Sequence, residues 1–140
     1  MAQTIHLEVV TPTGVAVRAE VDQVEGPSVF GEFGVLPGHL PLLAALREGV
    51  VRFRSAGKIT TLAVRAGFAE AGPDKTTVLT PEAVQGNEVD VATVRSRRDE
   101  LQRQLDEAAS KGGAIDESVT GERDWMNAQL DAARETGKSV

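Results

Sequence analysis

Hydrophobic and polar residues alternate along the first part of the chain with the period of two that is typical of β-strands. Ile5, Leu7 and Val9 are separated by polar residues. A turn is expected at residues 11–14, and the alternation resumes over residues 15–24. Further strands are predicted at residues 49–54, 58–65, 67–70 and 76–79, with glycine-containing joints between them. Several short strands at this spacing predict an antiparallel β-sandwich or flattened barrel.

The hydrophobic period changes beyond residue 86, where three- and four-residue steps favour a helix. Asp90 can cap this helix through its carboxylate, and the glycines at 112 and 113 end it. Asp116 can start a second helix. The apolar stripe of the first helix, with Arg98 as its polar interruption, consists of Val91, Val94, Leu101, Leu105 and Ala108.

The predicted fold class is therefore α+β, with an N-terminal antiparallel β-sandwich at residues 1–86 and a C-terminal two-helix hairpin at residues 87–140. The face of the second helix is formed by Val119, Met126, Leu130 and Ala133. A hairpin of this size has too little apolar surface to be rigid alone. We expect it to lean on the sandwich or on another protein, as a movable arm.

Charge and composition exclude several classes of function. The chain has 15 Lys and Arg against 21 Asp and Glu, a net charge of −6, so no nucleic-acid partner is expected, because a phosphate backbone requires a cationic face. The absence of cysteine excludes disulfides and Cys-ligated zinc. No apolar stretch has the length of a membrane span, so we expect no direct membrane insertion and any membrane association to come through a partner. The N-terminus does not resemble a secretory signal.

The most unusual segment is residues 31–42, Gly-Glu-Phe-Gly-Val-Leu-Pro-Gly-His-Leu-Pro-Leu. Pro37 restricts one backbone angle and Gly38 permits the left-handed region, so a strand followed by a tight turn is predicted. This turn would hold Glu32 and His39 in defined positions. His39 is expected to bond to backbone, the alternatives being a general base or a metal ligand. For Glu32 a solvated carboxylate and a partner contact are both open.

Segments 31–42, 5–12 (Ile-His-Leu-Glu-Val-Val-Thr-Pro), 64–70 (Val-Arg-Ala-Gly-Phe-Ala-Glu) and 77–83 together resemble the epsilon subunit family of rotary H⁺-transporting ATP synthases. The resemblance covers essentially the whole chain. It implies a non-catalytic subunit without a cofactor, whose sandwich packs on the gamma shaft and touches the membrane c-ring. Such a subunit couples proton translocation to ATP synthesis. It implies a rotor interface at Glu32, Gly38 and His39.

The resemblance further implies that the C-terminal arm inhibits ATP hydrolysis by reaching the alpha and beta catalytic subunits. The arm residues to which this role would fall are Arg95, Arg98, Arg103 and Arg123. The alternative for the basic side of the first helix is a solvated face with ion pairs at helical spacing. The implied location is peripheral, at the cytoplasmic face of the bacterial inner membrane, through the complex.

Some members of that family bind ATP through an apolar residue, Asp, two variable residues and Arg-Ala. Here Thr93 and Val94 occupy the Arg-Ala positions after Asp90, and Arg95 follows two positions late. ATP binding is therefore not expected. Two other classes are alternatives. A stand-alone ligand-binding sandwich is disfavoured by the few aromatic residues, and an independent enzyme by the lack of a nucleophile–base constellation in the sequence.

Overall fold

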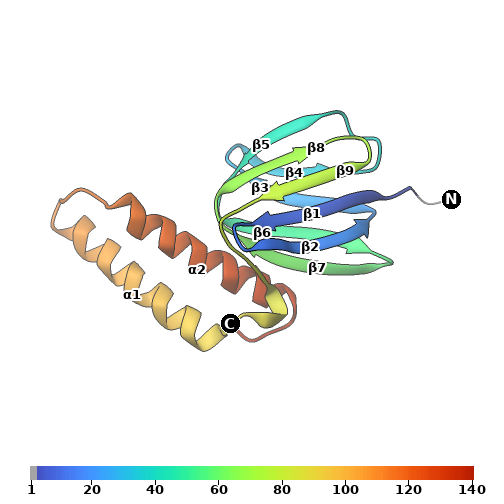
Figure 1. Cartoon of the computed structure of the whole chain (residues 1–140). Helices are drawn as coiled ribbons and strands as arrows, with labels where there is room; N and C mark the ends of the chain where they lie inside the picture. Colours follow the sequence, from blue (N-terminus) through green and yellow to red (C-terminus); the bar gives the residue numbers. More distant parts are fainter. Residues whose placement is uncertain (1–2) are drawn as a thin grey trace.

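The computed structural model describes residues 3–140, which form a β-sandwich and a helical hairpin that extends from one end of it (Figure 1). The sandwich is followed by a short 3₁₀ helix, η1, and two α-helices. The elements are β1 (Ile5–Thr11), β2 (Gly14–Val21), β3 (Gln23–Ser28), β4 (Gly31–Val35), β5 (Leu42–Leu46), β6 (Gly49–Ser55), β7 (Lys58–Val64), β8 (Gly67–Ala71), β9 (Lys75–Leu79), β10 (Ala83–Gln85), η1 (Gly86–Glu88), α1 (Val91–Ser110) and α2 (Glu117–Glu135).

The ten strands form one continuous sheet that folds over on itself, in the order β10-β7-β6-β3-β5-β8-β9-β1-β2, with β4 paired to β3. The pairs are antiparallel except for β1 and β9, which run parallel over His6–Val10 and Lys75–Leu79. The predicted sandwich is confirmed, with this one parallel pair as a departure from a purely antiparallel arrangement. In the sheet, β1 therefore lies between β2 and β9.

The stretch in which alternation was expected, residues 15–24, contains parts of two strands. The structure divides this stretch into β2 and β3, with Asp22 between them. β2 pairs with β1, whereas β3 pairs with β6, and the backbone N–H of Asp22 donates to the carbonyl of Arg54 (2.9 Å). The change of partner coincides with a break in the alternation, because the buried residues Val21 and Val24 are separated by two polar residues. The inward-facing positions therefore shift by one residue between β2 and β3.

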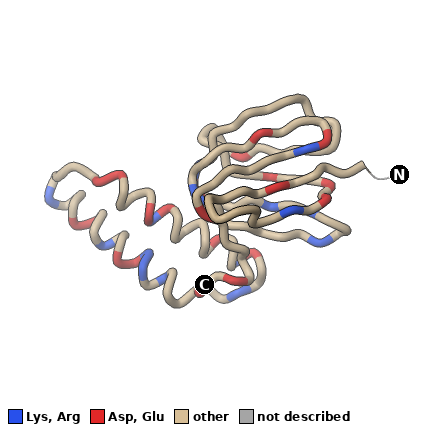
Figure 2. The backbone as a smooth tube through the Cα atoms, in the orientation of Figure 1, with Lys and Arg blue, Asp and Glu red and all other residues tan. Residues whose placement is uncertain are grey.

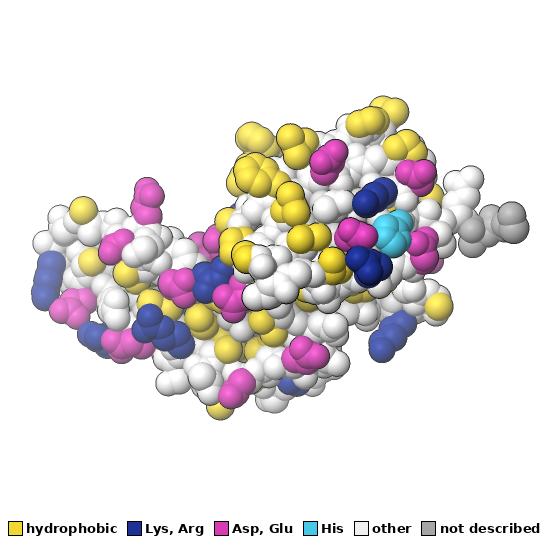
Figure 3. Space-filling model, viewed as in Figure 1, with side chains coloured by type: hydrophobic (Ala, Val, Ile, Leu, Met, Phe, Trp, Pro, Cys, Tyr) yellow, Lys and Arg dark blue, Asp and Glu magenta, His cyan; other side chains and the backbone are white. Residues whose placement is uncertain are grey.

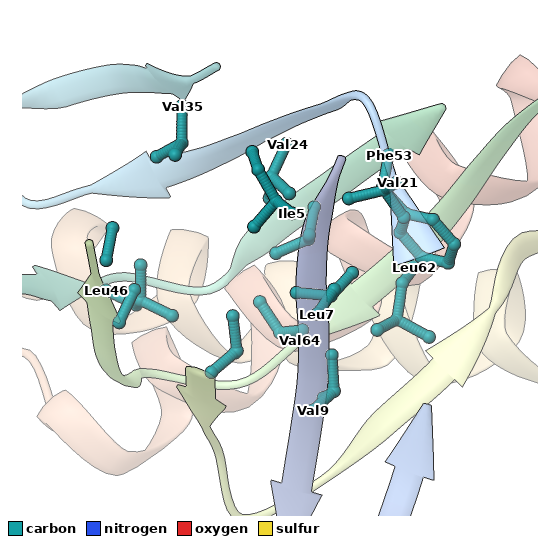
Figure 4. Close-up of a cluster of buried hydrophobic side chains, with 14 residues drawn as sticks. Ile5, Leu7, Val9, Val21, Val24, Val35, Leu46, Phe53, Leu62 and Val64 are labelled. Carbon is teal, nitrogen blue, oxygen red and sulfur yellow. The ribbon is translucent and has the colours of Figure 1, made fainter. Parts of the chain in front are cut away.

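The core of the sandwich is a cluster of fourteen buried apolar residues drawn from strands β1 to β9 (Figure 4). The alternating residues Ile5, Leu7 and Val9 are all fully buried, as the period-two pattern predicts. Val51, Leu62 and Val64 face them from β6 and β7. Burial of this many branched side chains stabilises the sheet mainly through the hydrophobic effect.

Both helices begin at the predicted caps. The Asp90 carboxylate accepts a hydrogen bond from the Thr93 N–H (3.3 Å), and that of Asp116 accepts one from the Ser118 N–H (2.9 Å). The turn between the helices contains Gly112 in the left-handed region (φ 67°) and lies at the end of the hairpin far from the sandwich (Figure 1). The hairpin prediction is thus confirmed, including its break after Ser110.

The second helix has two apolar faces, of which the sequence pattern indicated one. Met126, Leu130 and Ala133 pack with Val94 of α1, as expected. Trp125, Ala128 and Ala132 form the other face and pack on Val50 of β6 and Ala63 of β7. The hairpin therefore leans on the sandwich through α2, and α1 packs along α2.

Candidate functional site

The turn at residues 36–41, here called the signature turn, is tied to the rest of the sandwich by backbone hydrogen bonds. Gly38 has φ 86°, which explains the glycine at this position. Its N–H donates to the carbonyl of Pro73 (2.7 Å), and the N–H of His39 donates to the carbonyl of Leu36 (3.1 Å). The ring Nδ1 of His39 lies at hydrogen-bond distance from the carbonyl of Leu40. This is the backbone-bonded arrangement expected for this histidine.

Glu32 lies on β4 and does not join His39 in a shared site. Its carboxylate is 54% exposed and lies 3.9 Å from the Arg52 guanidinium. Arg52 also donates from Nε to Glu135 at the end of α2 (2.6 Å). Glu32 therefore lines a hollow between the sandwich and α2, where Arg47 and Asp131 also lie. Of the residues singled out by the motif, Gly38 and His39 form the turn, whereas Glu32 faces the arm.

A row of apolar side chains crosses the outer face of five neighbouring strands. The register places them opposite one another in adjacent strands, and a β-bulge after Val9 turns the last of them outward. This apolar row consists of Ala45, Phe68, Leu79, Val10 and Val15.

The apolar row is partly open to solvent, because Phe68 is 56% and Leu79 49% exposed. Leu43 on β5 adds to the same face and is 72% exposed. Figure 3 shows hydrophobic side chains gathered over this part of the sandwich. Contiguous exposed apolar surface of this kind is typical of interaction sites and makes the row a candidate for one. The sequence motifs missed it, because its members come from five separate strands.

Basic and acidic residues alternate along the outer side of α1 (Figure 2). Arg103 pairs with Glu100 (2.8 Å) and Glu107 (2.9 Å), and these hydrogen bonds raise its own pKa. The same guanidinium lowers the pKa of the Glu100 carboxyl to about 2. Arg98 donates to Asp99 and to Asn127 of α2.

The remaining arm arginines divide into paired and unpaired ones. Arg123 donates to Asp124 (2.9 Å) and to Gln102 of α1 (2.9 Å). Arg95, in contrast, makes no ion pair within residues 3–140. Of the four arginines singled out, only Arg103 fits the interpretation as a solvated face with ion pairs at helical spacing, because Arg98 and Arg123 each pair with the next residue in the sequence. Arg95 alone among those four is left to meet a partner without giving up an existing pair.

The region of the ATP-binding motif is used for helix capping. Asp90 Oδ2 accepts a hydrogen bond from the Thr93 hydroxyl (2.9 Å) in addition to the backbone bond of the cap. Thr93, which stands where the motif has arginine, therefore completes the start of α1. Among residues 3–140, no group of His, Asp or Glu is arranged to hold a metal ion. No helix in this range has the length and apolarity to cross a membrane.

The fold defines a β-sandwich protein with a C-terminal helical hairpin, and sequence comparison identifies the family. Residues 4–86 match the family described as "ATP synthase, Delta/Epsilon chain, beta-sandwich domain". The chain belongs to this family.

Relatives of this family match beyond the sandwich. The ATP synthase epsilon chain of Magnetococcus marinus is 42% identical over 94% of this chain and 96% of its own length. That of Syntrophobacter fumaroxidans is 39% identical over 79% of this chain and 83% of its own length. A chain in the structure of the Euglena gracilis mitochondrial ATP synthase, which comprises OSCP, F1 and c-ring, shares the fold with a TM-score of 0.65 and 24% identity, covering 99% of this chain and 83% of that one.

Proposed function

We propose that this protein is a non-catalytic subunit of the ATP synthase rotor that couples proton translocation to ATP synthesis. Residues 1–86 are the rotor-binding domain, and residues 87–140 are a movable regulatory arm. The partners are the gamma shaft and the membrane c-ring, and the arm reaches the alpha and beta subunits. The protein then sits peripherally at the cytoplasmic face of the bacterial inner membrane. The exposed apolar row, on a chain of the epsilon family, is the observation that carries this proposal.

The gamma shaft is the proposed occupant of the apolar row. Phe68, Leu79 and Leu43 are large, exposed and adjacent in the sheet. Burial of such side chains is the main source of stability of an interface core. The signature turn, with Gly38 and His39, is the proposed contact with the c-ring. Glu32, near the other end of β4, is the third proposed rotor residue and lies apart from the turn. Phe30, in the turn between β3 and β4, is 99% exposed and adds apolar surface at the end of β4 where Glu32 lies.

Substitution of the apolar row tests the gamma interface. In the full chain, Phe68→Glu should abolish co-purification with the cognate gamma subunit, because a charge would be buried at the interface without a partner. Ile59→Glu is the matched control, since Ile59 is 63% exposed on β7, outside the row. Loss of gamma binding in the control alone, or in neither variant, would contradict the assignment. A chain ending at Asn87 should still bind gamma.

The arm is proposed to restrain ATP hydrolysis without being needed for synthesis. Its contact with the sandwich depends on a small set of residues, so a partner that favours the extended position can shift it. Deletion from Asp90 onward should raise hydrolysis by the assembled enzyme and leave proton-driven synthesis largely intact. Because three arginines of the arm are already paired, Arg95→Ala should reproduce more of this effect than Arg103→Ala. Equal rates of ATP hydrolysis with and without the arm would contradict its proposed inhibitory role.

The same proposal holds that the arm does not bind ATP. The motivation is that Thr93, which stands where the nucleotide motif has arginine, donates hydrogen bonds to the N-cap residue Asp90. Calorimetric titration of the isolated protein with Mg-ATP should show no saturable heat at about 1 mM nucleotide. Saturation well below that concentration would mean that another residue has replaced the arginine.

A further inference from the structure

Arg65 occupies the corner where the sandwich meets the arm. It follows directly after β7, and its backbone is held from two sides. Its N–H donates to the carbonyl of Glu82 (3.1 Å), and its carbonyl accepts from the Thr80 hydroxyl (2.9 Å). The position of Arg65 is therefore set by the sandwich alone, independently of where the arm lies.

The side chain of Arg65 contacts three groups, two of them on α2. Nη1 donates to Glu122 Oε1 (2.6 Å) and Nη2 lies 3.5 Å from Oε2, so the guanidinium meets this carboxylate with both of its terminal nitrogens. Nε donates to Glu82 (3.2 Å). The guanidinium carbon also lies 4.9 Å from the ring centroid of Trp125. These four residues are called the Arg65 cluster.

The Arg65 cluster is among the more sheltered ion pairs of the arm. The Arg65 side chain is 25% exposed, and Trp125 below it is 1% exposed. Burial works against the charge of Arg65, but the hydrogen bonds to Glu122 and Glu82 outweigh it, and its pKa is raised. A charge over an aromatic face with a two-pronged carboxylate contact needs the planar fork of arginine, which lysine lacks.

Along the contact between α2 and the sandwich, the positive charges lie on the sandwich and the negative charges lie on α2. The sandwich contributes the cations Arg65 and Arg52, and α2 contributes the carboxylates Glu122 and Glu135. The two pairs lie at opposite ends of the face formed by Trp125, Ala128 and Ala132. Arg52 also serves Glu32 of the sandwich, whereas Arg65 adds contact with the buried tryptophan.

We propose that Arg65 is the residue that holds the arm on the sandwich, through Glu122 and Trp125, and that loss of this cluster releases the arm. A partner that offers a carboxylate to Arg65, or a cation to Glu122, would compete with the docked position directly. The consequence for hydrolysis rests on the proposed function of the arm. The docking role itself concerns the isolated protein and is testable without the rest of the complex.

The chain carries its own reporter for this test, because Trp125 is its only tryptophan. Arg65→Gln should increase the population of molecules with an undocked arm by about tenfold. Quenching of Trp125 by acrylamide should therefore increase. Glu122→Gln should act in the same direction, and Arg65→Lys should be intermediate. Arg54→Gln, which breaks the pair with Asp22 on the sandwich, is the matched control and should leave quenching unchanged.

Two further measurements separate docking from other effects. The far-UV circular dichroism of each variant should match that of the parent, which shows that the helices persist. Dyes on Lys58→Cys and Lys111→Cys, in a chain with no other cysteine, report the position of the arm without relying on the tryptophan. Exchange of the two charges, Arg65→Glu with Glu122→Arg, should restore part of the docked population. Quenching and dye distance equal to the parent in both Arg65→Gln and Glu122→Gln would overturn the proposal.

In the assembled enzyme, Arg65→Gln should lower ATP hydrolysis, because a released arm is the inhibitory one under the proposed function. A released arm with unchanged hydrolysis would contradict the inhibitory role of the arm, while the role of Arg65 in docking would still stand. An arm that stays docked in the variant would overturn the role of Arg65, whatever the rate of hydrolysis.

Discussion

The sandwich and the arm are stabilised in different ways. The core of the sandwich is a single cluster of fourteen buried apolar residues. The arm depends on two clusters with five and four buried residues, and three of the five on its contact with the sandwich are alanines. Because alanine buries little surface, much of the contact is left to Trp125 and to the flanking ion pairs. One part of the molecule thus has a large apolar core of its own, and the other is attached to it through a smaller apolar contact flanked by ion pairs.

Leu7→Ala should have the most severe effect. Leu7 is fully buried in the centre of the sandwich, so its truncation leaves a cavity and should cost about 2–5 kcal/mol of unfolding free energy. Urea titration followed by circular dichroism and Trp125 fluorescence should show both signals moving together, because the arm loses the surface on which it packs. Leu43→Ala, at a 72% exposed position, should stay within about 0.5 kcal/mol. Similar costs for the two variants would contradict the description of the core.

Gly86→Ala should affect the arm and spare the sandwich. A Cβ at this position would lie 2.3 Å from the carbonyl oxygen of Ala132 and 2.6 Å from the Thr61 hydroxyl, which donates to that carbonyl (3.0 Å). Undocking would relieve the clash at the cost of a buried hydrogen bond, about 1–3 kcal/mol. Acrylamide quenching of Trp125 should therefore increase while the unfolding midpoint of the sandwich is retained. Gly34→Ala, with no atom within 4 Å of its Cβ, is the control; a protected Trp125 in Gly86→Ala would refute the close approach.

Gly121→Ala should stabilise the arm. Gly121 lies inside α2, and no atom lies within 4 Å of a Cβ built there. Alanine should therefore add about 0.5–1 kcal/mol to the helix by reducing the entropy of the unfolded chain. Amide hydrogen exchange in α2 should slow, with the sandwich unchanged. Gly112→Ala should do the opposite, because Gly112 has φ 67° in the turn between the helices. Faster exchange in Gly121→Ala would be inconsistent with the open space around it.

A change of pH should affect the sandwich slightly and the arm less. The His6 ring lies between the Glu20 (2.7 Å) and Glu8 (3.2 Å) carboxylates, and these hydrogen bonds raise its pKa above 6.5. The stabilisation from this pairing is complete below the unfolded value and is lost as pH rises through the raised folded-state value. The unfolding midpoint should thus be slightly higher near pH 6 than near pH 8.5. His6→Gln should remove this difference; a difference that persists in the variant would have another origin.

The local features of the fold could be predicted from the sequence because each depends on neighbours in the chain. Alternation at Ile5, Leu7 and Val9 indicates one buried face of a strand, and Asp90 and Asp116 cap the helices through amides within three residues. Gly38 takes the left-handed backbone that the turn requires. For the same reason the signature turn could be placed, although the direction in which Glu32 faces could not.

Long-range pairing was decided by the tertiary structure. The parallel pairing of β1 with β9 brings Val10 beside Leu79, and only this closure of the sheet assembles the apolar row from five strands. Arg65 and Glu122 are separated by 57 positions, and no periodicity relates them. Likewise, the burial of Trp125 depends on which face of α2 meets the sandwich. The sequence by itself determined where strands, turns and helix caps lie, through short-range geometry. Which surfaces are covered and which are left open followed from sheet closure and helix docking, because those energies arise between residues that the chain separates.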